Sequence, residues 1–243
     1  MLCLNNFLIV GTANKLQLDS AKKAAMIRGL KVKDIPLASM KILVGFQEEN
    51  CRVSGGDELV LLHGIFLHET PTSLVNAIIN DFETFIKEYQ HQGILALISA
   101  KENVVKVIGD PTSTRTIFYL TTLKMFIIST DMESLKFIAK IFDIQFERDV
   151  LALYEIVLLG SIFSRRTMYK NVKRLLLGEC IIVKLLKDNA FEFLVQSYCD
   201  VSSTITEDTI HKEDKRAISI LIKIIIEQLS YVFITSRHSK TGN

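Results

Sequence analysis

The sequence has few of the features that mark linkers, membrane spans or secretion. Its 243 residues include only three prolines and no Gly/Ser tract, so no flexible linker is apparent before about residue 200. The most apolar segment, residues 218–234, is interrupted by Lys223, Glu227 and Gln228 and is too short in unbroken apolar length to span a bilayer. Residues 1–5 lack the basic segment and the long apolar run of a secretory signal.

The four cysteines are scattered, and none is paired at the short spacing of zinc or redox sites. They are Cys3, Cys51, Cys180 and Cys199. Cys180 lies in an apolar run, which indicates a place in the core. Because no secretory signal precedes these thiols, we expect a cytoplasmic protein in a reducing compartment, with no metal site and no membrane contact.

The charge is nearly balanced. A formal net charge of +2 at pH 7 does not predict an overall attraction to nucleic acid. Basic residues cluster at 165–174 and at 212–216, without the aromatic surface motifs of RNA-binding domains. We interpret both clusters as solvated loop and helix faces, and we expect no nucleic-acid partner.

A content of 49% hydrophobic and 23% charged residues is typical of a folded chain that can bury a sizeable core. The periodicity of apolar residues and the positions of turn residues predict the strands and helices. Strands are predicted at 4–10, 41–46, 58–62, 94–99, 104–108, 116–120, 125–129, after Gly178, and at 192–195. Helices are predicted from Thr72 or Ser73 to before Gly93, from a capping box at Thr130 and Glu133, from Leu151 to Gly160, and at 217–231, and residues 14–29 are a helical or irregular connection.

Strands that follow one another through hairpin-length links, with helices between some of them, predict an α+β fold with largely antiparallel sheets. We expect one domain over residues 1–201. Residues 202–243 would form a polar linker followed by an isoleucine-rich amphipathic helix, whose apolar face must pack on something.

The segment from Leu151 to Val183 contains a distinctive order of residues. A helix of pattern L-x-E-Y-L-x-x-G followed by R-T-x-[FY]-x-x-[IV]-x-x-L-x-P-G and a strand closes the glutaminase domain of asparagine synthases. This chain resembles that family. The matching places are Leu153, Tyr154, Leu158, Gly160, Arg166, Thr167, Met168, Tyr169, Val172, Leu175 and Gly178.

Three further segments are similar to the same domain, in the same order. Residues 92–97 are similar to the strand L-x-G-[MP]-F-A-F-A. Gly109-Asp110 with Tyr119 is similar to R-D-x-x-G-x-x-P-L-Y, and residues 126–129 with Lys136 are similar to F-A-S-E-x-K-A-L. The resemblance covers about residues 64–200.

The resemblance implies a four-layer α/β/β/α sandwich of the N-terminal-nucleophile hydrolase type, coupled to an ATP-using synthetase domain. In that family an N-terminal cysteine attacks the glutamine amide and ammonia leaves. An Asn-Gly pair supplies the oxyanion hole, and an R-x-R-G-x-[DE] motif binds glutamine. ATP and Mg²⁺ are expected only in the synthetase domain, so no cofactor is expected in this chain.

Several places depart from this chemistry. Removing Met1 would expose Leu2 rather than Cys3, so Cys3 is only a weak candidate nucleophile. The oxyanion pair reads His63-Gly64, which keeps the glycine and loses the Asn amide.

The glutamine-binding motifs are also missing. No R-H-R-G-P-[DE] occurs anywhere, and no S-D-x-E occurs near residues 70–73. Asp110 is a candidate pocket residue, although an Asp before Pro111 is equally a turn former. The loop S-G-G-x-D-S, which grips ATP pyrophosphate, does not follow residues 231–235.

Three hypotheses follow. The first is a degenerate glutaminase-like domain, retained as a scaffold or interaction domain of an asparagine-synthase-like amide ligase, whose partner is a synthetase domain or protein. The second is an active glutaminase that uses Cys3 after unusual processing and supplies ammonia for asparagine or a related amide. The third is a stand-alone binding module, which a fold without facing sheets would favour. A homodimer is compatible with all three.

Overall fold

The structure, a computed structural model, describes residues 7–37, 40–47, 51–52, 58–66, 71–88, 91–109, 115–186 and 190–198. The chain divides after Cys199 into one unit, Met1–Cys199, and a second, Asp200–Asn243. The second unit lies outside the described residues. The domain boundary at residue 201 and the helix at 217–231 therefore stay predictions.

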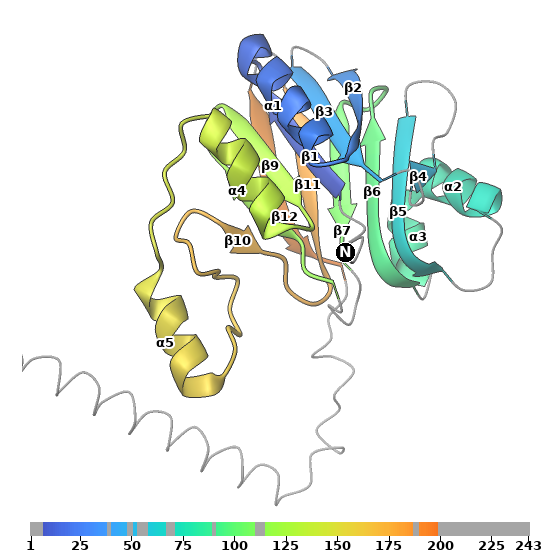
Figure 1. The fold of residues 1–243 in the computed structure, drawn as a ribbon. Helices are drawn as coiled ribbons and strands as arrows, with labels where there is room; N and C mark the ends of the chain where they lie inside the picture. Colours follow the sequence, from blue (N-terminus) through green and yellow to red (C-terminus); the bar gives the residue numbers. More distant parts are fainter. Residues whose placement is uncertain are drawn as a thin grey trace, which may run out of the picture. The chain divides into compact units, whose positions relative to one another are not determined.

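Two antiparallel sheets of six strands form the centre of the first unit (Figure 1). Sheet A has the order β10-β8-β9-β1-β3-β2, and sheet B has the order β12-β11-β7-β6-β5-β4. The strands of sheet A are β1 (Phe7–Thr12), β2 (Lys31–Leu37), β3 (Met40–Phe46), β8 (Phe118–Thr121), β9 (Met125–Ser129) and β10 (Lys173–Arg174). Those of sheet B are β4 (Cys51–Arg52), β5 (Glu58–Phe66), β6 (His91–Ser99), β7 (Val104–Ile108), β11 (Glu179–Leu185) and β12 (Phe191–Ser197).

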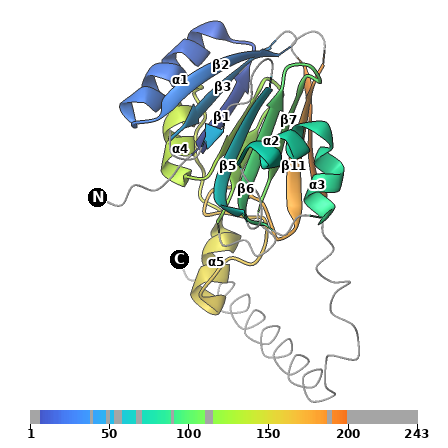
Figure 2. The same ribbon diagram turned by 90° about the vertical axis from the view of Figure 1, so that its right-hand side faces the viewer.

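Helices cover the outer face of each sheet, as the two views show (Figure 2). Sheet A packs against α1 (Lys15–Ile27) and α4 (Met132–Ile141), and sheet B packs against α2 (Pro71–Asn80) and α3 (Phe82–Glu88). A third apolar cluster, with members from both sheets, fills the space between them. The fold is therefore α+β, a four-layer α/β/β/α sandwich of antiparallel sheets, and this prediction is confirmed.

Strand β1 illustrates why both faces of a central strand are apolar. All six of its residues are buried. Phe7 and Ile9 point into the layer between the sheets, whereas Leu8 and Val10 point toward α1 and α4. Alternate side chains of a strand face opposite sides, so a strand in the middle of this sandwich needs apolar residues at every position.

Strand β2 was not predicted. Its sequence alternates charged with apolar residues, which is typical of a half-exposed strand, but it also contains Pro36, which is disfavoured inside a sheet. In the structure β2 pairs only with β3 and lies at the end of sheet A. A proline is tolerated on such an edge strand, because one side of the strand donates no ladder hydrogen bonds.

The single helix predicted from Thr72 or Ser73 is two helices. α2 ends at Asn80 and α3 begins at Phe82. Asp81 lies between them, and its Oδ1 accepts a hydrogen bond from the Thr84 backbone N–H at 3.0 Å. The apolar spacing continues across this cap, so periodicity alone did not reveal the break.

The capping box predicted at Thr130 and Glu133 is also wrong. The N-cap of α4 is Asp131, whose Oδ2 accepts from the Ser134 backbone N–H at 2.8 Å and from the Ser134 hydroxyl at 2.6 Å. Thr130 Oγ1 instead accepts from the Phe7 backbone N–H at 3.0 Å. Thr130 therefore fixes the beginning of β1 rather than the beginning of a helix.

The cap gives the protein a specific pH dependence. Burial would raise the pKa of Asp131, but the hydrogen bonds from Ser134 and the charge of Arg28, whose Nη2 lies 3.3 Å away, hold this pKa below its ordinary value. The stability that the carboxylate contributes is therefore present above about pH 4 and is lost as the pH falls through the lower folded-state pKa. Asparagine keeps the cap and removes only the charge, so in urea unfolding we expect Asp131→Asn to lower the free energy of unfolding by roughly 0.3–1 kcal/mol at pH 7. The variant should also lose less stability than the wild type as the pH falls.

Asp34→Asn is the matched control, because Asp34 pairs with Lys22 at 2.6 Å on the exposed surface. This control should change the free energy of unfolding by less than about 0.5 kcal/mol. Equal acid profiles for wild type and Asp131→Asn would contradict the role of the Asp131 charge.

Candidate functional site

Of the predicted site residues, the structure describes His63 and Gly64, which lie at one end of sheet B, opposite Ile94 and Gly93 and near the end of β7. We call this end of the sandwich the proximal end and define it by Phe7 of β1, Ser129 of β9, Gly109 after β7 and Glu179 of β11. In sheet A, Leu8 pairs with Ser129. The two sheets meet at this end, because a Cβ at Gly109 would lie 3.8 Å from Ile117 Cδ1, just before β8.

His63 and Gly64 lie within β5, whose predicted end was Leu62. The strand continues to Phe66, and the backbones of His63 and Gly64 pair with Ile94 and Gly93 of β6. The pair therefore sits in a regular ladder rather than in the loop after a strand.

The other two candidate residues, Cys3 and Asp110, lie outside the described residues. Their neighbours are fixed. The carbonyl oxygen of Gly109 accepts a hydrogen bond from the Tyr198 hydroxyl at 2.7 Å, and the Gly109 backbone N–H donates to the Glu179 carbonyl at 3.4 Å. The chain is thus held in place up to the residue before Asp110.

An arginine–carboxylate pair lies at the proximal end, and it was not predicted from the sequence. Glu179 is a buried side chain at the start of β11. One of its oxygens accepts from Arg165 Nε at 3.0 Å and also from Arg165 Nη2, and the other accepts from the Leu176 backbone N–H at 2.8 Å. The hydrogen bonds to Glu179 raise the pKa of Arg165 above its ordinary value.

Tyr119 of β8 lies in the electric field of this pair. Burial raises the pKa of the Tyr119 hydroxyl, the charge of Arg165 lowers it, and the charge of Glu179 raises it. The net effect is an elevated pKa, so Tyr119 keeps its proton at neutral pH. Its ring stacks on Phe193 of β12 with centroids 5.5 Å apart.

The interpretation of residues 165–174 as a solvated basic face is only partly right. The side chains of Arg165 and Arg166 are 48% and 40% exposed, yet their guanidinium groups have partners. Arg166 Nη1 lies 3.3 Å from Glu155, and Arg174 Nε donates to the Ser164 carbonyl at 2.9 Å. These groups stabilise the loop that leads from α5 (Val150–Leu159) to β11.

Thr167, the second residue of the R-T pair, is buried in that loop. Its Oγ1 lies 3.0 Å from the Val172 carbonyl oxygen and 3.1 Å from that of Tyr169, and it accepts from the Tyr169 backbone N–H at 3.1 Å. A single hydroxyl thus satisfies several backbone groups of the turn. Its observed role is structural.

Cys180 is fully buried in β11, as predicted. Burial raises its pKa to about 11, with smaller effects from neighbouring charges. A thiol with this pKa is almost entirely protonated at neutral pH, so Cys180 cannot replace an N-terminal nucleophile.

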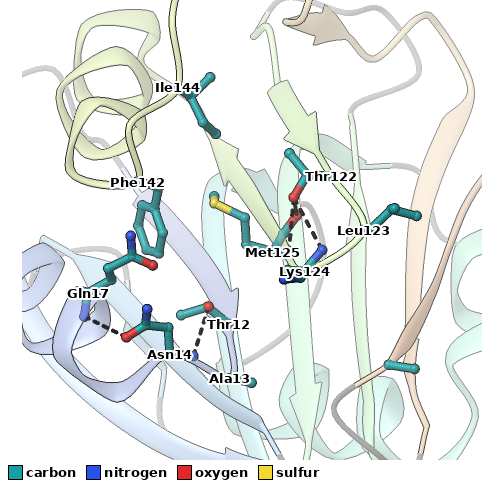
Figure 3. A pocket seen from close by; sticks show the side chains of 11 residues that line it. Thr12, Ala13, Asn14, Gln17, Thr122, Leu123, Lys124, Met125, Phe142 and Ile144 are labelled. Carbon is teal, nitrogen blue, oxygen red and sulfur yellow. Dashed lines mark hydrogen bonds between the residues drawn. The ribbon is translucent and has the colours of Figure 1, made fainter.

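A cavity of about 1150 Å³ opens at the opposite end of sheet A (Figure 3). Thr12, the last residue of β1, lines it and pairs with Met125, whereas Leu8 pairs with Ser129 at the proximal end. The lining is mostly apolar and includes Phe142 after α4, with Lys124 as its one charged side chain. Neither His63 nor Gly64, the predicted site residues that the structure describes, lines this cavity.

The described part of the chain lacks a metal-binding cluster and a membrane-spanning helix. It has no cluster of three His, Cys, Asp or Glu side chains that could bind a metal ion. None of its helices combines the length and the apolar character needed to cross a bilayer.

No protein-family model matches this sequence, and no curated protein matches it either. Among solved structures, the chain is similar to glutamine phosphoribosylpyrophosphate amidotransferase from B. subtilis complexed with ADP and GMP, at 9% identity and a TM-score of 0.48, over 80% of this chain and 49% of that chain. It is also similar to a structure described as the allosteric regulatory enzyme of purine biosynthesis, at 8% identity and a TM-score of 0.46, over 79% and 49% of the two chains. The chain spans about half the length of these structures.

The Arg165–Glu179 pair provides a test of what holds the proximal end together. Glu179→Ala leaves the Leu176 backbone N–H and the Arg165 guanidinium without their acceptor, and we expect a loss of about 2 kcal/mol in the free energy of unfolding in urea. Glu147→Ala, which removes an exposed ion pair with Lys170, should cost less than about 0.5 kcal/mol. Equal losses for the two variants would show that the buried pair contributes no more than a surface pair.

Proposed function

We propose that this chain is a degenerate type-2 glutamine amidotransferase domain of an asparagine-synthase-like, ATP-dependent amide ligase, and that it serves as a scaffold or interaction domain without glutaminase activity. The observation that carries the proposal is the agreement between the four-layer sandwich and the segment from Leu151 to Val183. That segment has the family's order of residues and folds as helix, loop and strand.

Local geometry supports this assignment. Gly160 ends α5 in the left-handed conformation with φ of 73°, where a glycine is the residue of lowest cost. Gly178, with φ of 65°, precedes β11 in the same way. The spacing of glycines and threonine in the motif thus corresponds to specific backbone requirements of this fold.

The loss of activity is proposed from the residues themselves. The family's chemistry needs an Asn side chain before Gly64 to bind the oxyanion, and this chain has His63 there. The glutamine-binding R-H-R-G-P-[DE] motif is absent from the sequence. Each loss alone would reduce turnover, and together they would weaken both oxyanion stabilisation and substrate binding.

The partner that this proposal requires is a synthetase domain or protein of the amide-ligase type. It would bind ATP and Mg²⁺, and this chain would contribute surface rather than ammonia. The alternative of a stand-alone binding module would be favoured by a fold without facing sheets, and the described residues form two facing sheets.

The test is ammonia release from glutamine by the purified protein, with an intact mass of the same sample and a Cys3→Ala control. We expect wild type and Cys3→Ala to release ammonia at the same background rate. Release by the wild type that disappears in Cys3→Ala, from a protein whose first residue is Cys3, would overturn the proposal and establish an active glutaminase.

A further inference from the structure

The cavity at the Thr12 end of sheet A has the size of a small-molecule site. Its volume is about 1150 Å³, and sites for drug-sized ligands typically measure about 300–1,000 Å³. Its walls come from the junction of β1 with α1, the turn between β8 and β9, the segment after α4, and Ala190 before β12 (Figure 3). Because β1, β8 and β9 are paired in sheet A, the walls that they carry are held in place without a ligand.

Most of the lining surface is apolar. Met125 is only 5% exposed and belongs to the apolar cluster beneath α1 and α4, and Phe142 and Ile144 are half-buried against the same cluster. Leu123 also lines the cavity and is 96% exposed. A single exposed leucine is ordinary on a protein surface, but this one adjoins an apolar cavity. It therefore extends the surface that the hydrocarbon part of a ligand can cover.

The charge of the lining has one sign. Lys124 is the charged residue among the described residues that line the cavity, and it forms no ion pair with another described residue. Asp143 lies between Phe142 and Ile144 in the sequence but does not line the cavity. The first turn of α1, which begins beside the cavity, contains no acidic residue. Within the described part of the chain, no carboxylate in the lining offsets the charge of Lys124.

Thr122 holds the turn that carries Leu123 and Lys124. Its Oγ1 accepts from the backbone N–H groups of Lys124 and Met125, both at 3.3 Å, and its backbone N–H donates to the Met125 carbonyl at 2.9 Å. A hydroxyl engaged in this way keeps the turn in one conformation. The backbone positions of the exposed leucine and of the lysine beside the cavity are thereby fixed.

We propose that this cavity binds a small amphipathic anion, which is an aliphatic chain with one anionic head group. The chain would contact Met125, Phe142 and Leu123, and the head group would pair with Lys124. A positively charged head group would be repelled by Lys124, and a ligand without an apolar part would leave the apolar walls in water. The inference does not rest on the proposed function, since neither His63 nor Gly64 lines this cavity.

Equilibrium dialysis of the full chain against radiolabelled decanoate, below its micelle concentration, tests the site. We expect saturable binding of one decanoate per chain. Lys124→Glu reverses the charge beside the head group and should raise the dissociation constant at least about tenfold. Ala13→Trp, at an exposed lining position, narrows the cavity and should also weaken binding. Circular dichroism should show both variants folded, because both positions are exposed. Competition by decyl phosphate shows whether a phosphate head group binds better than a carboxylate.

Lys23→Glu is the matched control. Lys23 is exposed on α1 and does not line the cavity, so this variant has the net charge of Lys124→Glu and should bind decanoate like the wild type. Decyltrimethylammonium has the same chain with a positive head group and should compete at least about tenfold less well than unlabelled decanoate.

Three outcomes in dialysis would overturn the proposal. They are the absence of saturable decanoate binding by the wild type, equal effects of Lys124→Glu and Lys23→Glu, and equal competition by decyltrimethylammonium and decanoate. Cosedimentation with vesicles of anionic phospholipid, by a chain that does not bind free decanoate, would overturn it as well and would indicate a membrane-surface site instead.

Discussion

The apolar layer between the two sheets is the constraint on which the rest of the molecule depends. Leu61 and Ile181 of sheet B meet Ile9 and Phe126 of sheet A there, and each of these side chains is essentially inaccessible to water. Once two sheets bury their inner faces, their outer apolar faces need helices, and α1 with α4 and α2 with α3 provide them. Polar side chains are thereby confined to the ends and the surface of the sandwich. A site with chemistry can be built only at an end, where strands begin or stop.

The segment from α5 to β11 contains residues whose role is to satisfy the backbone of the fold. In the segment from α5 to β11, Gly160 ends a helix, Thr167 satisfies backbone groups of a turn, and the backbone N–H of Leu176 is bound by Glu179. These are requirements of the fold itself. The pairing of His63 with Ile94 of β6 is likewise a backbone contact, which does not depend on the histidine side chain.

Local signals predicted the fold well where one sequence feature decides the outcome. The β6–β7 hairpin follows from two apolar runs around a polar turn, and α5 ends at Gly160, as predicted. Sequence could not reveal contacts that depend on where distant segments meet. Arg165 and Glu179 are fourteen positions apart and pair only because the intervening loop folds back. The exposure of apolar side chains on α5 could not be predicted either, because the periodicity of a helix shows which residues share a face but not what covers that face. For the site, Cys3 and Asp110 lie outside the described residues and stay predictions.

The edges of the two sheets affect how readily the molecule aggregates at high protein concentration. A bare strand edge is a template onto which another chain can add a strand, and long flat edges lead toward fibrils. Here β10 and β4 are only two residues long, and β2 combines Pro36 with the charged residues Lys31, Lys33 and Asp34. Three of the four edges are therefore poor templates for cross-β growth. These three edges therefore favour association through side chains, which can be reversible and closed, over association through backbone ladders, which is open-ended.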